Sequence, residues 1–261
     1  MTSTIRQIAL LFAFLLLGFA PAASAQPTTA ERTAAEIVRD AVDYWRDTGS
    51  ETYSEMVVHR PSWERAMSMH GWTQGMNKSL IRFTAPARDA GNASLTVDDE
   101  VWTFSPKVNR IIKIPPSMKS QSWMGSDFSY RDLARADDIV DDYNHRLLRT
   151  ERADEHDVYV VESVPLESAP VVWGREVLRI RDDNVMLQHL FYDQDNKLVK
   201  KMTSTEIRAF GEKLYPAIMR MEKVEEVDEW TEVRTSKAEF GVSVPDYVFT
   251  LSNLRNPRSG R

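Results

Sequence analysis

Between residues 52 and 236, most of the chain consists of segments in which apolar and polar side chains alternate. A period of two is typical of β-strands, because successive side chains of a strand point to opposite faces of the sheet. Turn-forming residues, such as Asp182-Asp183-Asn184, separate neighbouring segments. Apart from one segment near 130–143, no helical pattern is interleaved. The sequence therefore predicts an antiparallel meander rather than a doubly wound sheet.

The predicted strands form two groups, one before and one after a loop at 115–128. The first group is 52–60, 62–74, 78–84, 93–98, 100–105 and 108–114, and the second is 145–152, 156–164, 173–181, 185–193, 197–210, 213–224 and 228–236. One face of a strand is usually apolar and the other mixed. Leu178 and Ile180, for example, share a face with Glu176 and oppose Arg179. This pattern is expected of a curved sheet with one covered side.

Helical spacing is found in two segments. The first is predicted near 30–47, with Thr28 or Thr29 as its cap, because these apolar residues fall on one face: Ala34, Ile37, Val38, Ala41, Val42 and Trp45. The second is predicted near 130–143, where Ser129 and Asp132 resemble a capping box. Its wetter side is expected to carry Asp137, Asp138, Asp141 and Asp142. A short helix or strand is expected after Pro245, near Asp246 to Leu254.

The first 25 residues have the order of a secretory signal peptide. Arg6 precedes an apolar run from Ile8 to Ala20, and Ala23-Ser24-Ala25 predicts cleavage before Gln26. An uncleaved anchor is the alternative, although the run is short for a membrane span. The chain has no cysteine, so it has neither a disulfide nor the cysteine of a bacterial lipoprotein. We expect one domain over residues 26–261, unanchored in a bacterial periplasm.

Composition and motifs argue against several functions. The formal net charge of −6 disfavours nucleic acid as a partner. There is no P-loop, no G-x-S-x-G and no H-E-x-x-H, and each of the five histidines stands alone in the sequence. The acidic cluster near 137–142 lacks the spacing of an EF-hand. We therefore expect no enzyme activity, no cofactor and no metal, with a hydrolase using Ser126-Asp127 and a distant histidine as an alternative.

The loop at 115–128 has an unusual composition for a turn. Met118, Trp123, Met124 and Phe128 stand among serines, a glycine and other polar residues. The whole chain has seven tryptophans and eleven methionines, and methionine suits surfaces that accept variable apolar shapes. The loop therefore has the composition of a flap over a hydrophobic cavity. For any single residue, ordinary core packing is the alternative.

The central part of the chain resembles a known family. Residues 80–133, LIRFTAPARDAGNASLTVDDEVWTFSPKVNRIIKIPPSMKSQSWMGSDFSYRDL, are similar to the outer membrane lipoprotein-sorting proteins of the LolA-like superfamily of periplasmic lipid carriers. The matching features are the spacing of Pro86 and Gly91, the strand end from Trp102 to Pro106, and the run SQSWMGSDF. Ser105 stands where the family often has leucine, a departure that bears on cavity shape rather than on the fold.

The resemblance implies a mainly β (α+β) fold, a strongly curved antiparallel half-barrel whose concave face is covered by helices. The loop at 115–128 would then line or gate a lipid-binding cavity, with Trp123 partly exposed in the empty protein. The residues expected to bind lipid are Leu80, Trp102, Phe104, Ile112, Ile114, Met118, Trp123, Met124 and Phe128.

By the same resemblance, we expect a monomeric periplasmic carrier or chaperone that binds lipid or the acyl chains of a lipoprotein. It would transfer them to or from the outer membrane, with an inner-membrane transporter as a partner. The alternative is a non-catalytic sensor or adaptor for a membrane partner, such as a transporter of the RND type. A related domain in a periplasmic stress regulator binds a partner protein.

Overall fold

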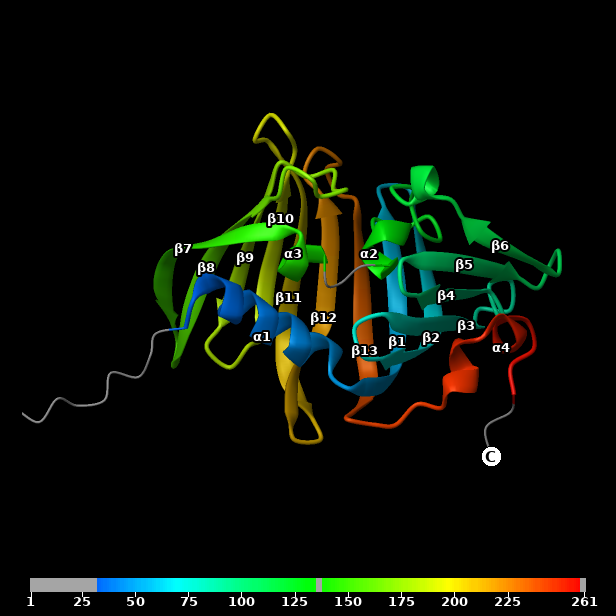
Figure 1. Cartoon of the computed structure of the whole chain (residues 1–261). Coiled ribbons are helices and arrows are strands. Elements are labelled where there is room, and N and C mark those ends of the chain that lie inside the picture. Colours follow the sequence, from blue (N-terminus) through cyan, green and yellow to red (C-terminus); the bar gives the residue numbers. More distant parts are fainter. Residues whose placement is uncertain (1–31, 135–137, 259–261) are drawn as a thin grey trace, which may run out of the picture. The chain divides into compact units, whose positions relative to one another are not determined.

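The described chain is built around a single large β-sheet. The structure, a computed structural model, describes residues 32–134 and 138–258. The predicted signal peptide and the expected caps Thr28 and Thr29 lie outside the described residues. All the strands within the described residues join one 13-stranded sheet, and every neighbouring pair is antiparallel. The fold class is therefore mainly β with few helices, as predicted (Figure 1).

Each predicted strand has an observed counterpart. The first group comprises β1 Gly49–Arg60, β2 Trp63–Gln74, β3 Lys78–Ala85, β4 Ala93–Val97, β5 Glu100–Ser105 and β6 Arg110–Ile114. The second comprises β7 Tyr143–Ala153, β8 His156–Pro165, β9 Arg175–Arg181, β10 Met186–Tyr192, β11 Leu198–Phe210, β12 Lys213–Lys223 and β13 Trp230–Phe240. The ends differ from the predicted ends by a few residues.

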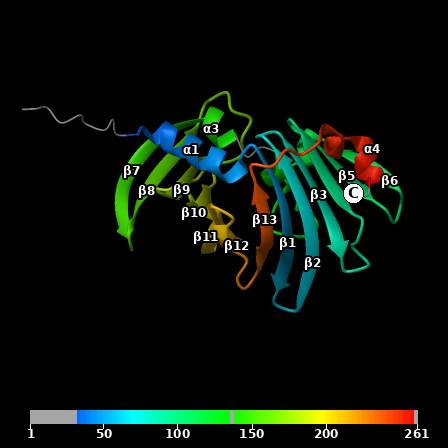
Figure 2. The same cartoon turned by 90° about the horizontal axis from the view of Figure 1, so that it is seen from below.

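The sheet consists of two meanders that meet in its middle. The strand order is β6-β5-β4-β3-β2-β1-β13-β12-β11-β10-β9-β8-β7. The meanders are joined where β1 pairs with β13, from Ser50 opposite Phe240 to His59 opposite Trp230. Both views show β13 beside β1 (Figures 1 and 2). This arrangement leaves β6 and β7 as the two edges of the sheet.

Because β6 and β7 lie at opposite edges, the segment between them must cross a face of the sheet. This crossing segment, residues 115–142, contains η1 Pro116–Met118, α2 Tyr130–Ala134 and α3 Asp138–Asp141. The predicted capping box is confirmed, since Ser129 N–H donates to Asp132 Oδ2 (2.6 Å) and Asp132 N–H to Ser129 Oγ (3.3 Å). The expectation that Asp138 lies on a wet side is wrong, because only 8% of this residue is exposed.

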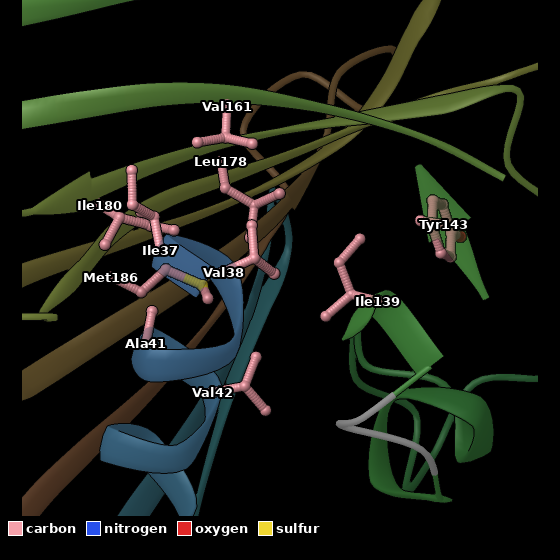
Figure 3. Close-up of a cluster of buried hydrophobic side chains, with 10 residues drawn as sticks. All are labelled: Ile37, Val38, Ala41, Val42, Ile139, Tyr143, Val161, Leu178, Ile180 and Met186. Atoms are coloured by element: carbon pink, nitrogen blue, oxygen red, sulfur yellow. The ribbon is translucent and has the colours of Figure 1, made fainter. Parts of the chain in front are cut away.

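Helix α1, Ala34–Arg46, covers the second meander on the side of the sheet where the crossing segment also packs. Its cap is Thr33, which forms a reciprocal capping box with Glu36. The predicted apolar stripe packs on β8–β10: the buried side chains of α1 lie against Leu178, Ile180 and Met186 (Figure 3). Full burial of such a side chain contributes about 1.5–3 kcal/mol, so the stripe accounts for the docking of α1.

The opposite face of β3–β5 is covered by the C-terminal segment, which contains η2 Asp246–Phe249 and α4 Leu251–Arg255. Its apolar residues form a C-terminal cluster with the strands, and the buried members are Leu80, Ala93, Leu95, Phe104, Val244, Val248, Phe249 and Leu254. The short terminal element predicted after Pro245 is thus confirmed. Among the described residues, no helix has the length and apolar character needed to span a membrane.

Candidate functional site

A cavity of about 350 Å³ lies between the sheet and the elements that cover it. Its walls come from α1, the crossing segment and strands of both meanders. Methionines form much of the apolar wall, namely Met69, Met186, Met202, Met219 and Met221. These are five of the eleven methionines in the chain. The volume falls within the range of small-molecule sites, and the flexible thioethers can adapt to ligands of different shapes.

Two of the nine expected lipid-binding residues, Trp123 and Phe128, line this cavity. Three others, Leu80, Trp102 and Phe104, belong to the C-terminal cluster on the opposite face of the sheet. The alternation along β3 explains the separation, because Ile81 faces the cavity while its neighbour Leu80 faces the C-terminal segment.

The remaining four expected residues lie outside the cavity wall. Ile114 is buried in a small cluster near α2, and Met124 packs beside Trp123. Ile112 is 53% exposed and Met118 is 38% exposed. The crossing segment therefore contributes to the cavity mainly through its second half, from Trp123 onward.

Trp123 is a buried anchor in this structure rather than a partly exposed gate. Only 2% of the residue is exposed, and its indole Nε1–H donates to Ser94 Oγ at 2.9 Å. Its ring packs against Phe83, with centroids 5.5 Å apart. The expectation of a partly exposed tryptophan is therefore wrong. The composition of the loop favours a flap, but in the structure Trp123 attaches the crossing segment to β3 and β4.

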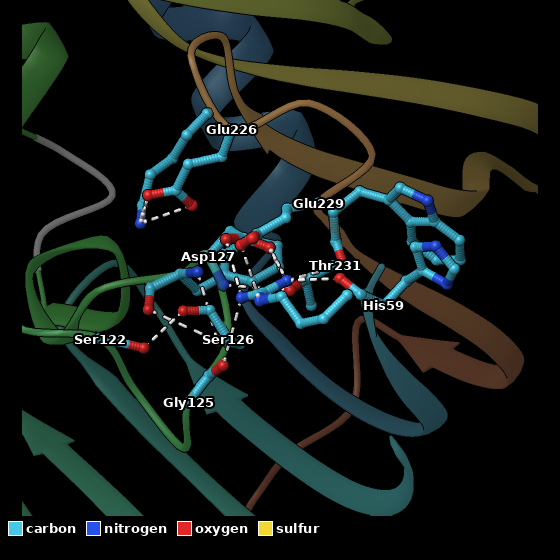
Figure 4. Close-up of polar contacts among 12 residues, drawn as sticks. His59, Ser122, Gly125, Ser126, Asp127, Glu226, Glu229 and Thr231 are labelled. Carbon is cyan, nitrogen blue, oxygen red and sulfur yellow. Dashed lines mark hydrogen bonds and ion pairs between the residues drawn. The ribbon is translucent and has the colours of Figure 1, made fainter. Parts of the chain in front are cut away.

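A buried ion pair fixes the same loop to the centre of the sheet (Figure 4). The Asp127 side chain is fully buried and accepts two hydrogen bonds from Arg60 of β1, at 3.0 and 3.1 Å. It also accepts one from the hydroxyl of Thr231 on β13, at 2.7 Å. Arg60 in turn forms an ion pair with Glu229 at 3.1 Å. Because charge-assisted hydrogen bonds are strong, this network holds the loop at the junction of the two meanders.

The serine considered for hydrolysis is part of the loop structure. Ser126 is 2% exposed, and its hydroxyl donates to the carbonyl of Trp123 at 2.6 Å. Neither Ser126 nor Asp127 has a histidine partner among the described residues. The adjacent serine and aspartate thus stabilise a turn and an ion pair.

A second buried carboxylate, Glu176 of β9, lies in the cavity wall and is 4% exposed. Tyr143 donates its hydroxyl hydrogen to Oε1, and His189 of β10 is bonded through Nε2 to Oε2. Burial, together with the charge of Glu176, raises the pKa of Tyr143 well above its ordinary value. Tyr143 therefore remains a hydrogen-bond donor throughout the physiological pH range.

Other charged groups extend this polar end of the cavity, which we define as Arg131, Asp132, Asp138, Glu176 and His189. Asp132 is paired with Lys200 at 2.6 Å. Arg131 donates from Nη1 to the carbonyl of Pro170 at 3.0 Å. Its Nε is buried and has no hydrogen-bond partner within the described part of the chain.

Sequence reasoning missed the polar end. One signal was present: Glu176 alternates in phase with Leu178 and Ile180, so a carboxylate was predicted on the covered face. A buried carboxylate needs hydrogen-bond partners, and these come from Tyr143 and His189, which are distant in sequence. Tyr143 and His189 come close to Glu176 because of the strand register, which cannot be read from the sequence.

One group of side chains in the described ranges has metal-ligand spacing. Ligand atoms of His156, Asp182 and Asp183 lie within 4.8 Å of one another. These groups already have partners, because His156 Nδ1 lies 2.6 Å from Asp182 and Arg181 pairs with Asp183 at 2.5 Å. The ion pairs explain this group without a metal, and the absence of a metal site stays a prediction.

The chain matches a family model, described only as an uncharacterized protein, over residues 75–256. No curated protein matches it. Among solved structures, it is similar to a DUF1329 family protein from Desulfovibrio piger, with 25% identity and a TM-score of 0.77. That match covers 85% of this chain and 97% of the other.

Two further structures have names that agree with the resemblance drawn from the sequence. One, from Vibrio parahaemolyticus, is described as an outer membrane lipoprotein-sorting protein domain, with 23% identity, a TM-score of 0.75, and coverage of 85% of this chain and 98% of the other. The other is a LolA superfamily protein from Nitrosomonas europaea, with 23% identity, a TM-score of 0.69, and coverage of 85% and 99%. At these identities the likeness shows the fold.

Proposed function

We propose that this chain, which belongs to the family of uncharacterized proteins matched over residues 75–256 and has a LolA-like fold, binds the acyl chains of a lipid or lipoprotein in its cavity. The observation that carries the proposal is the apolar cavity between the sheet and its covering elements. Each methylene moved from water into such a site contributes about 0.8 kcal/mol. Burial of a long acyl chain therefore supplies binding free energy without any directional contact.

The apolar wall suits this ligand because of its methionines. Met186 and Met202 come from the second meander and Met69 from the first, so the ligand would contact both halves of the sheet. Trp123 and Phe128 would supply the aromatic part of the wall. We propose these residues as the acyl-binding set, with Leu80 and Phe104 supporting the sheet from its other face.

In this proposal the protein is a non-catalytic carrier that acts in the periplasm after removal of residues 1–25. It functions as a single domain and a monomer, without a cofactor or metal. The sheet wraps the ligand as an unclosed, curved half-barrel, and a sheet of so many strands is expected to curl. The carrier passes its ligand to or from the outer membrane, and an inner-membrane transporter is its partner. Directional transfer requires an acceptor or a second state with different affinity.

The first test is to purify the mature protein gently and examine it by native mass spectrometry, followed by lipid extraction. We expect a bound lipid, and we expect the purified protein to bind the uncharged fluorescent probe N-phenyl-1-naphthylamine. Met202→Gln, which places an amide in the cavity wall, should weaken probe binding. Met118→Gln is the matched control, because Met118 is exposed and outside the wall.

A protein that emerges empty and binds no probe would contradict the carrier proposal. That result would favour the sensor or adaptor role, in which the membrane partner rather than a lipid is the ligand. Equal probe binding by Met202→Gln and wild type would show that the probe binds elsewhere.

A further inference from the structure

The turns at one end of the first meander form a surface that is separate from the cavity. In an antiparallel meander, alternate turns lie at the same end of the sheet, so the turns that follow β1, β3 and β5 are neighbours. We call them the turn surface and define it as residues 61–65, 86–92 and 106–110. Gly91 lies so close to Pro106 that an added Cβ would be 3.1 Å from its ring. The cavity wall, as far as the described residues form it, includes none of this surface.

Two large apolar side chains are exposed on the turn surface. Trp63 is 49% exposed and Val108 is 60% exposed. They stand at separate turns, and Pro61 and Pro106 near them are also exposed. Single exposed apolar residues are common on protein surfaces, so exposure alone indicates no partner. What these side chains can bind depends on the charges around them.

The turn surface is basic, although the chain as a whole is acidic. Its cationic residues are Arg65, Arg88, Lys107 and Arg110. Its only carboxylates are Glu64 and Asp89, so four positive and two negative charges give a formal charge of +2, against −6 for the chain. Trp63, both carboxylates and the first three cations line one open cleft, which shows that they lie together.

The charges within the turn surface leave two cations without a carboxylate. Asp89 is 5% exposed and accepts hydrogen bonds from Nε of Arg65 at 3.2 Å and from Nε of Arg88 at 3.3 Å. Lys107 and Arg110 are exposed, and no carboxylate among the described residues lies within ion-pair distance of either. Their positive charges can therefore act on a partner outside the chain.

An acidic turn, residues 225–229, lies beside the turn surface, because β13 begins next to the end of β1. Each of its four carboxylates is within ion-pair distance of a basic side chain. The pairs are Glu225 with Lys197, Glu226 with Lys223, Asp228 with His59 and Glu229 with Arg60. This pairing reduces the negative field that the acidic turn adds to the turn surface.

We infer that the turn surface docks on a bilayer that contains anionic phospholipid. Exposed tryptophan together with Lys and Arg is typical of the membrane–water interface, because the indole ring suits the headgroup layer and the cations attract anionic headgroups. A protein partner would usually bury a contiguous apolar core, whereas Trp63 and Val108 stand at separate turns and can enter the headgroup layer singly. The inference goes beyond the proposed function and does not depend on what the cavity binds.

The test is co-sedimentation of the mature protein with lipid vesicles. One set is phosphatidylcholine alone, and the other contains about a quarter of the anionic lipid phosphatidylglycerol. We expect binding to the anionic vesicles, little binding to the neutral ones, and loss of binding at about 0.5 M salt, where charges are screened. Equal binding to both sets would overturn the inference. A protein that stays in solution with both would also overturn it and would point to an acidic protein as the partner of the cations.

Two substitutions that break no ion pair make the test specific to this surface. Lys107→Gln and Arg110→Gln should each weaken binding to the anionic vesicles by about fivefold, the contribution expected of one cation near such a membrane. Arg152→Gln is the matched control, because Arg152 is an exposed arginine of the other edge strand, β7, and its loss changes the net charge equally. Trp63→Ala should also weaken binding, since the indole ring no longer enters the headgroup layer. Unchanged binding by Trp63→Ala or by the two charge variants would overturn the inference, as would an equal loss in Arg152→Gln.

Docking and cavity binding can fail separately. Because no residue of the turn surface lines the cavity as described, all three variants should bind N-phenyl-1-naphthylamine as wild type does. Loss of probe binding together with vesicle binding would show that the substitution acts through the whole fold, and would overturn the assignment to this surface. A wild-type protein that binds vesicles but no probe would refute the carrier proposal and leave the docking surface standing.

Discussion

Two buried carboxylates, Asp127 in the crossing segment and Glu176 in the cavity wall, are satisfied in different ways. Asp127 accepts from Arg60 and Thr231, and its own N–H donates to Thr231, so the network closes on itself. Glu176 is equally buried, but one of its partners is a histidine whose second ring nitrogen has no hydrogen bond in the described part of the chain. The first network lies outside the cavity wall, and the second lies in it.

The difference shows that burial and hydrogen bonding alone do not identify a ligand site. What separates the two regions is whether the partners of the buried charge are themselves satisfied. Removing a member of the Asp127 network, which lies outside the cavity wall, should reduce stability and leave ligand binding unchanged. Removing a member of the Glu176 network, which lies in the cavity wall, should change ligand binding with a smaller effect on stability. The predictions below test this contrast.

The largest loss of stability is expected for Trp123→Ala in the crossing segment. Trp123 is buried and bonded to Ser94, so its truncation should cost about 3–5 kcal/mol of unfolding free energy. Trp102→Ala is the control, because Trp102 is only partly buried at the margin of the C-terminal cluster, and it should cost less. Urea unfolding monitored by circular dichroism measures both. A larger loss for Trp102→Ala would mean that the loop contributes little to stability.

Asp127→Asn should have the next largest effect. The substitution keeps the shape of the side chain but removes the charge that Arg60 pairs with, and we expect a loss of about 1.5–3 kcal/mol. Glu239→Gln breaks an exposed pair with Lys237 and should cost almost nothing. The affinity for N-phenyl-1-naphthylamine should stay that of wild type. Weaker binding of the probe would show that the loop network also acts on the cavity.

Tyr143→Phe tests the network around Glu176. Loss of the hydroxyl leaves the buried Glu176 with one donor fewer, at an expected cost of about 1–2 kcal/mol. Because Glu176 then holds His189 less firmly in the cavity wall, binding of N-phenyl-1-naphthylamine should weaken. Tyr53→Phe, which removes an exposed hydroxyl bonded to Glu51, is the control for both readouts. Equal stability and equal probe binding of Tyr143→Phe and Tyr53→Phe would show that the Glu176 network has no special role in the cavity.

The smallest effect concerns a third carboxylate, Glu232 of β13. Burial alone would raise its pKa, but hydrogen bonds from Arg220 and Arg234 outweigh burial and hold the pKa below its ordinary value. Its stabilising contribution is therefore present above the unfolded pKa of about 4.3 and is lost as the pH falls through the folded pKa. Between about pH 5 and pH 3, wild type should lose more stability than Glu232→Gln, by about 1 kcal/mol or less. Parallel pH profiles of thermal unfolding would contradict this.

The strands could be predicted because nearly every one is bordered by turn residues and carries a period of two. The pairing of β1 with β13 could not, since the alternation within a strand says nothing about a distant partner. A bulge also changes which side chains of a strand share a face. The register between β10 and β9 shifts between Met186 and Gln188, so Met186 joins His189 and Phe191 in the cavity wall. Simple alternation places Met186 opposite the other two.

The candidate site was predicted only in part, for a related physical reason. Both faces of β3–β5 are covered, one by the crossing segment and the other by the C-terminal segment. Apolar residues are then required on both faces, and the pattern no longer shows which face holds a cavity. Leu80 and Phe104 have the apolar character expected of a cavity wall, but the same character serves the C-terminal cluster. Of the residues that the composition of the crossing segment indicates, Trp123 and Phe128 line the cavity.

The pairing of the first strand with the last also determines the order in which the molecule can fold. Ser50 pairs with Phe240, so almost the whole chain must be available before the two meanders can join. Closing so long a loop is slow, and until it closes, β1 presents an unpaired edge that can join another chain. The cavity, whose wall draws on both meanders, is therefore one of the last features to form. For such a chain, the interval between synthesis and closure is the period of greatest exposure to aggregation.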